Sequence, residues 1–373
     1  MGQDAEPQAT VLGATLSVVD QSPLRKGGTG ADALTESVRL AQRCEQLGYA
    51  RYWVAEHHAS TSWTGASPEI LIGQIAAGTS TIRVGSGGVM LSHYSALKVA
   101  EQFRALDAFH PGRIDLGVGR APGSDQRTAF ALAHPRQPAD VRTFPRQVHD
   151  LLAFLSGEMA AEHPFAGISA LPGPQPATGP EVWLLGSSDY SARLAAMLGL
   201  PFAFADFFGN LEHGPLVADL YRGEFQPSAY LDAPRLNVTV QVMCAPTEEE
   251  ARYLASSRDL NKLRQLHLER PSEPASAGGD LRTGLLPPDE AAELPLRETE
   301  RAALSQLSAH YIDGDPGQVR EGILDASARY GTTDIGIVTN CFAFEDRVRS
   351  YELVAGAFGL RGEGEPFTST QAP

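Results

Sequence analysis

The residues best suited to acid–base chemistry are Glu56, His57 and His58, which directly follow a short apolar run. An imidazole, whose ordinary pKa is about 6.5, exchanges protons at neutral pH. Side chains alternate along a strand, so Glu56 and His58 share one side and His57 takes the other. This alternation argues against a joint metal site. We predict His57 and Glu56 as catalytic residues, with His57 as acid or base and Glu56 and His58 supporting it. A hydrogen-bonded structural pair is the alternative.

A second group of residues suits the binding of an anion. Arg120 lies in a glycine-rich loop after an apolar run, and a guanidinium can hold a phosphate or carboxylate through two hydrogen bonds. Ser187, Ser188 and Ser191 lie where another apolar run enters a helical pattern, and a helix start favours anions. An ordinary helix cap is the alternative for these serines. If an anion does bind there, Asp189 must face solvent.

Two adjacent glycines, Gly87 and Gly88, interrupt the apolar run 84–91. Glycines inside a strand mark a bulge or the close approach of a ligand to the backbone. They also tolerate unusual backbone geometry, including a non-prolyl cis peptide bond. A simple bulge is the alternative.

The elements that must position these groups alternate between apolar runs and helical patterns. The expected strands cover 11–19, 51–55, 82–90, 114–118, 182–185, 201–205, 238–243 and 335–338, and the expected helices include 32–47, 68–77, 96–109, 140–155 and 191–198. Eight strands in this rhythm predict an α/β fold, a (β/α)₈ TIM barrel, whose active site lies at the C-terminal strand ends. A doubly wound sheet is the alternative, but no Gly-x-Gly-x-x-Gly follows the first strand.

The chain reads as one domain with two irregular segments. We expect a loose tail at 1–10, a single barrel domain at 11–360 and a C-terminal tail at 361–373. Residues 157–180 are rich in glycine and proline, and residues 268–297 are longer and charged. A long segment without regular structure is typical of a lid, so we predict a flap over about 266–300. In the first helix, Asp32 is the expected N-cap and Gly48 the expected end.

Composition excludes several classes of partner. The net charge of −15 disfavours nucleic acid and other polyanions. No apolar stretch reaches the about 18 residues of a membrane-spanning helix. Residues 1–10 lack the basic start and apolar core of a secretion signal. Three widely spaced cysteines suit a reducing compartment, so we predict a cytoplasmic protein.

Taken together, these segments resemble the bacterial luciferase-like flavin monooxygenases, in particular the single-subunit luciferase family oxidoreductases. The resemblance covers about residues 12–358. The strings that carry it are Tyr52-Trp-Val-Ala-Glu-His-His58, Val84-Gly-Ser-Gly-Gly-Val-Met-Leu91, Ala100-Glu-Gln-Phe103, Pro111-Gly-Arg-Ile-Asp-Leu-Gly-Val-Gly-Arg-Ala-Pro-Gly-Ser-Asp-Gln-Arg127, Val182-Trp-Leu-Leu-Gly-Ser-Ser188, Gly199-Leu-Pro-Phe-Ala-Phe-Ala205 and Gly314-Asp-Pro316.

This resemblance implies a barrel that binds reduced FMN, supplied by a separate NAD(P)H:flavin reductase, and reacts it with O₂. The resulting flavin C4a-(hydro)peroxide would oxygenate a small organic substrate. By residue, His57 matches the catalytic histidine and Gly87-Gly88 the cis peptide beside the isoalloxazine. Arg120 matches the arginine on the flavin phosphate, which the three serines complete. Relatives of this kind also imply a homodimer.

Two departures separate this chain from the family pattern. Gly119 stands where luciferase has a reactive cysteine, and Leu91-Ser92-His93-Tyr94-Ser95-Ala96 replaces the usual Leu-Pro-Asn-His-Ser-Pro. The flap at 268–297 matches no fixed pattern. The candidate substrate-lining residues are Trp63, Phe204 and Phe207, with Trp183 and Phe208 as further aromatics, although barrel aromatics are more often core.

Substrate and chemistry therefore stay open at this point. A GC-rich composition favours an actinobacterial source, so an aromatic polyketide from antibiotic biosynthesis is the specific expectation. Long-chain aldehyde oxidation is the second. Hydride transfer with F420, and a non-catalytic flavin-binding protein, are the alternatives from other classes.

Overall fold

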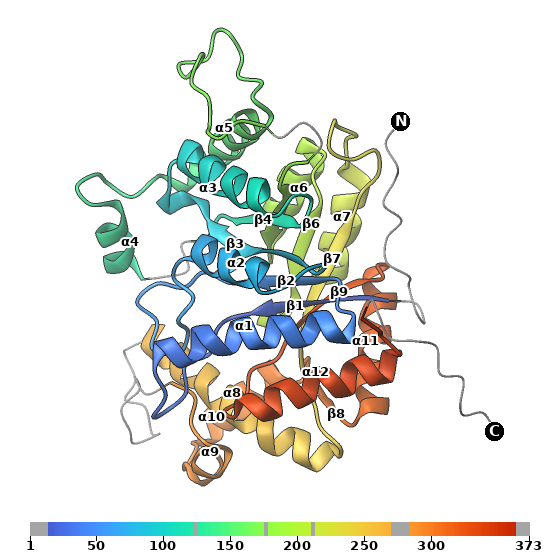
Figure 1. Ribbon diagram of the computed structural model, residues 1–373. Helices are drawn as coiled ribbons and strands as arrows, with labels where there is room; N and C mark the ends of the chain where they lie inside the picture. Colours follow the sequence, from blue (N-terminus) through green and yellow to red (C-terminus); the bar gives the residue numbers. More distant parts are fainter. Residues whose placement is uncertain (1–13, 122–124, 175–177, 210–212, 270–283, 363–373) are drawn as a thin grey trace, which may run out of the picture.

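The computed structural model describes the chain except for residues 1–13, 122–124, 175–177, 210–212, 270–283 and 363–373. Its centre is a closed barrel of eight parallel strands (Figure 1). They are β1 (Thr15–Asp20), β2 (Arg51–Val54), β3 (Arg83–Met90), β4 (Ile114–Gly119), β5 (Glu181–Gly186), β6 (Phe202–Ala205), β7 (Leu236–Cys244) and β9 (Asp334–Val338). The strands follow chain order, and the β6–β7 and β9–β1 pairings close the ring. The (β/α)₈ barrel predicted from the sequence is confirmed, with all eight expected strands.

A ninth short strand, β8 (Ile312–Gly314), lies outside the ring and pairs only with the C-terminal end of β7. Three residues are too few to produce a period-2 pattern, which is why the sequence did not reveal it. β7 is nine residues long and buried throughout because it serves both the barrel and this extra pairing.

The helices surround the barrel and bury its outer face (Figure 1). They are α1 (Gly30–Leu47), α2 (Pro68–Ala77), α3 (Ala96–Phe109), α4 (Gln126–Ala133), α5 (Phe144–Ser156), α6 (Asp189–Leu198), α7 (Gly214–Glu224), α8 (Glu248–Glu269), α9 (Pro288–Glu293), α10 (Glu298–Ser308), α11 (Pro316–Tyr330) and α12 (Phe344–Phe358). None of the helices in the described part of the chain is both long and apolar enough to cross a bilayer.

The start of α1 corrects one expectation. Thr29, not Asp32, is the N-cap: its hydroxyl accepts from the Asp32 backbone N–H, while the Asp32 carboxylate accepts from the Thr29 N–H. Asp32 is the third helical residue of this capping box, a position where acidic residues are favourable. Gly48 ends the helix in the left-handed region at φ 87°, as expected.

The barrel interior is filled in its middle layer by aromatic rings. Trp53 and Trp183 are almost fully buried and meet edge to face, with ring centroids 5.2 Å apart. Val19, Ala203 and Val338 complete this cluster. Trp183, considered above as a lining residue, belongs to the core.

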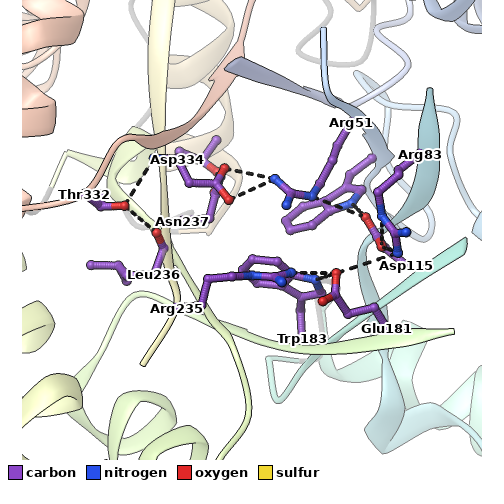
Figure 2. A network of polar contacts seen from close by, with 12 residues as sticks. Arg51, Arg83, Asp115, Glu181, Trp183, Arg235, Leu236, Asn237, Thr332 and Asp334 are labelled. Atoms are coloured by element: carbon purple, nitrogen blue, oxygen red, sulfur yellow. Dashed lines mark hydrogen bonds and ion pairs between the residues drawn. The ribbon is translucent and has the colours of Figure 1, made fainter. Parts of the chain in front are cut away.

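Below these rings, charged residues close the N-terminal end of the barrel (Figure 2). Asp115 is fully buried and is bonded by the Arg83 guanidinium and by Trp53 Nε1, the latter at 2.8 Å. Arg51 reaches Asp334 at 2.9 Å. We call this cluster of strand-start charges the polar plug; its ion-pair members are Arg51, Arg83, Asp115, Glu181, Arg235 and Asp334.

Trp183 connects the plug to the rings above it. The Arg235 guanidinium lies 4.3 Å from the Trp183 ring centroid and that of Arg51 lies 5.2 Å away. Arg235 also pairs with Glu181 at 2.6 Å. Burial acts to raise the pKa of Glu181, but Arg235 and the other two guanidiniums hold it below its ordinary value.

The segment predicted as a flap is partly docked on the barrel. Leu285 and Leu286 are buried, and Leu285 forms a bridge with Arg25 of the β1–α1 loop. The Ser257 hydroxyl of α8 donates to the Leu286 carbonyl at 2.6 Å. In the described part of this segment, residues 284–300, two apolar residues are thus anchored on the barrel. Residues 270–283 of the predicted flap lie outside the described residues.

Candidate active site

A cavity of about 520 Å³ opens at the C-terminal ends of the strands, as the barrel fold predicts. Contributions come from β1 through β7 and from the starts of the following loops. Its walls are formed by Val19, Trp53, Gly87, Gly88, Met90, Gly119, Arg120, Ala121, Val141, Leu185, Gly186, Ser187, Ser188, Ser191, Ala203, Phe204, Ala205, Phe207, Phe208 and Thr239.

Glycines keep one wall of this cavity free of side chains. The Gly87–Gly88 peptide bond is cis. A Cβ on Gly88 would lie 2.7 Å from the Gly117 carbonyl oxygen, so β3 and β4 are in close backbone contact there. A Cβ on Gly119 would meet no heavy atom within 4 Å. This wall is therefore bare backbone, and the space in front of Gly119 is open to a flat ligand.

The predicted anion-binding residues converge on one corner of the cavity. Arg120, at the end of β4, lies 4.0 Å from the ring centroid of Tyr190 and so is held by a cation–π contact. Ser188 occupies the N-cap position of α6 but makes no capping hydrogen bond with its side chain. Ser191 lines the same corner and Asp189 is exposed to solvent. The Ser188 hydroxyl is therefore available to a ligand, and the ordinary-cap alternative does not hold for it.

The Glu56 carboxylate connects three parts of the site. It is 1% exposed, and one oxygen accepts from the Tyr94 hydroxyl at 2.7 Å and contacts His58 Nε2 at 2.6 Å. The other oxygen accepts from the Met90 backbone N–H at 2.9 Å. Since Met90 follows the glycine wall, Glu56 joins the end of β2 to that wall. The contact between Glu56 and His58 agrees with their predicted placement on one side.

Burial also shapes the chemistry of His57. Burial lowers the pKa of His57 to about 4, with Glu56 acting against it, so the ring is neutral at physiological pH. Its backbone N–H donates to the Gly65 carbonyl, and its ring centroid lies 6.0 Å from that of Trp63. His57 Nδ1 is buried and has no hydrogen-bond partner among the described residues.

The structure thus brings most, but not all, of the predicted residues to one cavity. Gly87, Gly88, Arg120, the three serines, Phe204 and Phe207 line it. His57, Glu56 and Trp63 lie at or just after the end of β2 and do not line it. Sequence reasoning missed the roles of Tyr94 and Tyr190, although the unusual 91–96 string marked Tyr94 as a changed position. Within the described ranges, no group of three or more His, Cys, Asp or Glu could hold a metal.

Comparison with known proteins decides the family. The model of the luciferase-like monooxygenase domain matches residues 14–333. The chain belongs to the luciferase-like monooxygenase family. A luciferase-like monooxygenase of Escherichia coli K12 is 38% identical over 340 residues, covering 90% of this chain and 95% of that protein. The solved structure of apo-MsnO8 superposes with a TM-score of 0.82 at 38% identity, covering 93% of this chain and 99% of that one.

A further luciferase-like relative carries a more specific name. The N-acetyl-S-alkylcysteine monooxygenase of Bacillus subtilis is 35% identical over 353 residues, covering 92% of this chain and 97% of that protein. Family membership confirms the resemblance seen in the sequence. It makes this chain an enzyme, a flavin-dependent monooxygenase.

Proposed function

We propose that this luciferase-like protein binds reduced FMN, delivered by a separate NAD(P)H:flavin reductase, and uses O₂ to oxygenate a small organic substrate. The observation that carries the proposal is the corner formed by Arg120, Ser188 and Ser191 beside a cavity wall of bare glycine backbone. Charge, hydroxyls and a helix start meet there, as a phosphate requires.

The residues present fit FMN by a second criterion. The space in front of Gly119 is open, and the adjoining wall at Gly87–Gly88 carries no side chain. A flat ring system would lie against this wall while its phosphate reached Arg120. When bound, the reduced flavin would supply the electrons that activate O₂.

The chain's own residues would then position groups and move protons. Glu56 fixes the Met90 end of the glycine wall, and the apolar lining of the cavity excludes water. The neutral His57 could accept a proton through its unpartnered Nδ1. We propose His57 as the acid or base and Glu56 as a positioning residue.

Titration of the apo protein with FMN, riboflavin and F420 tests the cofactor. FMN should bind at least tenfold more tightly than riboflavin, because only FMN carries the phosphate. Arg120→Met and Ser188→Ala should remove most of this preference without lowering the Tm, since Ser188 does not cap α6 with its side chain. An equal affinity for FMN and riboflavin, or a preference for F420, contradicts the proposal.

The reaction itself is tested with ¹⁸O₂ and a flavin reductase. Incorporation of one labelled oxygen atom into product supports a monooxygenase. F420-dependent hydride transfer predicts reduction of the substrate without O₂, and a non-catalytic flavin-binding protein predicts oxygen uptake no greater than that of reduced FMN alone.

For the substrate, we propose a planar ring system such as an aromatic polyketide, with a long-chain aldehyde as the second candidate. Phe204, Phe207 and Phe208 form an aromatic side of the cavity, which favours flat apolar ligands. A role in antibiotic biosynthesis, a homodimeric state and a cytoplasmic location are parts of the same proposal.

A further inference from the structure

Three carboxamide side chains cluster at the mouth of the barrel, on strands that the cofactor proposal does not use. Gln21 follows β1, Gln241 lies in β7 and Asn340 follows β9. All three are more than nine-tenths buried. Asn340 Nδ2 donates to Gln21 Oε1 at 2.6 Å.

These side chains face the barrel interior, just beyond the cavity-lining layer. Thr239 of β7 and Val19 of β1 line the cavity. Gln241 lies two residues after Thr239, and Gln21 lies two residues after Val19. Because side chains two residues apart in a strand share a face, Gln241 points inward with Thr239. Gln21 is placed inward by its bond to Asn340, which comes from the neighbouring strand end.

The cluster contains a hydrogen-bond donor and an acceptor without partners. Gln241 Nε2 and Asn340 Oδ1 are both buried and have no hydrogen bond within the described part of the chain. His57 Nδ1, shortly after the end of β2, is also buried and has no hydrogen-bond partner among the described residues. Buried polar atoms are nearly always bonded, so the two such atoms on the adjoining strands β7 and β9 indicate a ligand or ordered water.

The position of the carboxamides in the ring of eight strands separates them from the anion corner. In the order of the eight strands, β9 lies opposite β4 and β1 opposite β5. Arg120 follows β4 and Ser188 follows β5, so the carboxamides occupy the other half of the mouth. None of the three carboxamides is among the residues that line the cavity at the anion corner.

We propose that Gln241 and Asn340 form a substrate-binding subsite that recognises a planar group with a carbonyl acceptor beside an N–H or O–H donor. Gln241 donates to the carbonyl and Asn340 accepts from the donor, while Gln21 fixes the orientation of Asn340. Carboxamides and hydroxy-carbonyl groups have this chemistry. The subsite rests on the proposed function.

Binding of two probes to the protein with oxidised FMN, and in parallel to the apo protein, tests the subsite without turnover. The probes are 2-naphthamide, which carries the donor and acceptor, and 2-ethylnaphthalene, which carries neither. By isothermal titration calorimetry, 2-naphthamide should bind about five- to tenfold more tightly. Gln241→Met should abolish this preference and leave FMN affinity unchanged.

A matched control removes an equivalent group elsewhere. Gln147 in α5 also has a buried unpartnered oxygen, so Gln147→Met should leave probe preference unchanged. The Tm of Gln241→Met should stay close to that of the wild type, because Gln241 Nε2 has no described partner to lose in the free protein. Equal binding of both probes to wild type, or a preference that survives Gln241→Met, means that the carboxamides hold ordered water only and overturns the subsite. Failure of FMN to bind while the apo protein keeps the preference overturns only the cofactor proposal.

Discussion

At the scale of single residues, the proposed chemistry depends on one neutral imidazole and one carboxylate with several hydrogen bonds. His57 and Glu56 are neighbours in sequence, yet burial gives them different roles. His57 keeps a ring nitrogen without a partner, while every described bond of Glu56 holds another part of the site. These contacts support the proposal that Glu56 is a positioning residue and His57 the acid or base.

Replacing His57 by asparagine should lower kcat by about 10²–10⁴-fold, the range of a lost general acid or base. FMN affinity should stay within about twofold, since His57 does not line the cavity. Steady-state kinetics with a coupled reductase, and FMN titration of the same samples, measure both. An unchanged kcat would contradict a catalytic role for His57.

The lowered pKa of His57 also predicts acid sensitivity. The ring titrates near 4 in the folded protein and near its ordinary 6.5 when unfolded, so the unfolded state binds more protons as pH falls. The penalty is absent above pH 6.5 and grows down to about pH 4. Between pH 7.5 and 4.5, wild type should lose roughly 1–2 kcal/mol more stability than His57→Asn, after discounting for partial exposure. Urea unfolding at several pH values checks this, and parallel losses in both proteins would refute it.

Tyr94 should stabilise the fold through Glu56. Tyr94→Phe removes a hydrogen bond to a buried carboxylate and should cost about 1.5–3 kcal/mol in the free energy of unfolding. Tyr253→Phe is the matched control, because the Tyr253 hydroxyl donates to the Asp289 carboxylate at the surface and its removal should cost much less. Equal losses in the two variants would show that Tyr94 has no special place in the site.

At the scale of elements, the glycines of β3 and β4 have different roles. Gly88 permits close contact between the two strands, whereas Gly119 leaves space in the cavity. The same substitution type should therefore have opposite effects at these two positions.

Gly119→Leu should keep the wild-type Tm and weaken FMN binding at least tenfold, because the new side chain enters open space that the ring system would need. Gly88→Ala should lower the free energy of unfolding by about 1–3 kcal/mol, because its Cβ would lie 2.7 Å from the Gly117 oxygen. Thermal unfolding and FMN titration of both variants separate the two effects. Tight FMN binding by Gly119→Leu would place the ligand elsewhere.

At the scale of the whole molecule, the barrel was largely predictable and its plug was not. Apolar runs predicted all eight barrel strands because each is buried on both faces. The plug escaped notice because its ion pairs join residues far apart in sequence, such as Arg51 with Asp334. A signal was present, since Arg51, Arg83, Glu181 and Asp334 are each the first residue of a strand.

The site was predictable to a similar degree. The resemblance grouped Arg120 with the three serines, and all four line the cavity, because local strings define a helix start and a loop. It could not show that Glu56 bonds Met90 and Tyr94, since those partners are about 34 and 38 positions away and depend on packing. The docked part of the flap was missed for the same reason: Leu285 is anchored by Leu24 and Arg25.

Asp115 should be the most sensitive member of the plug. Asp115→Asn leaves Arg83 without its buried partner and should cost about 3–5 kcal/mol in the free energy of unfolding. Asp140→Asn is the control, because its partner Arg142 is exposed and the loss in the free energy of unfolding should be much smaller. Urea unfolding measures both, and a small loss at Asp115 would mean that water replaces the lost charge.

The plug has a consequence for the order of events during turnover. Charged pairs close the N-terminal end of the barrel below two tryptophan rings, so on the proposed function flavin, oxygen, substrate and product would all use the C-terminal side of the described cavity (Figure 2). Of two molecules that share one entrance, the one that binds deeper in the cavity would bind first and leave last. Binding and release would then follow a compulsory order. A bulky product that leaves slowly would delay the exchange of oxidised flavin for reduced flavin.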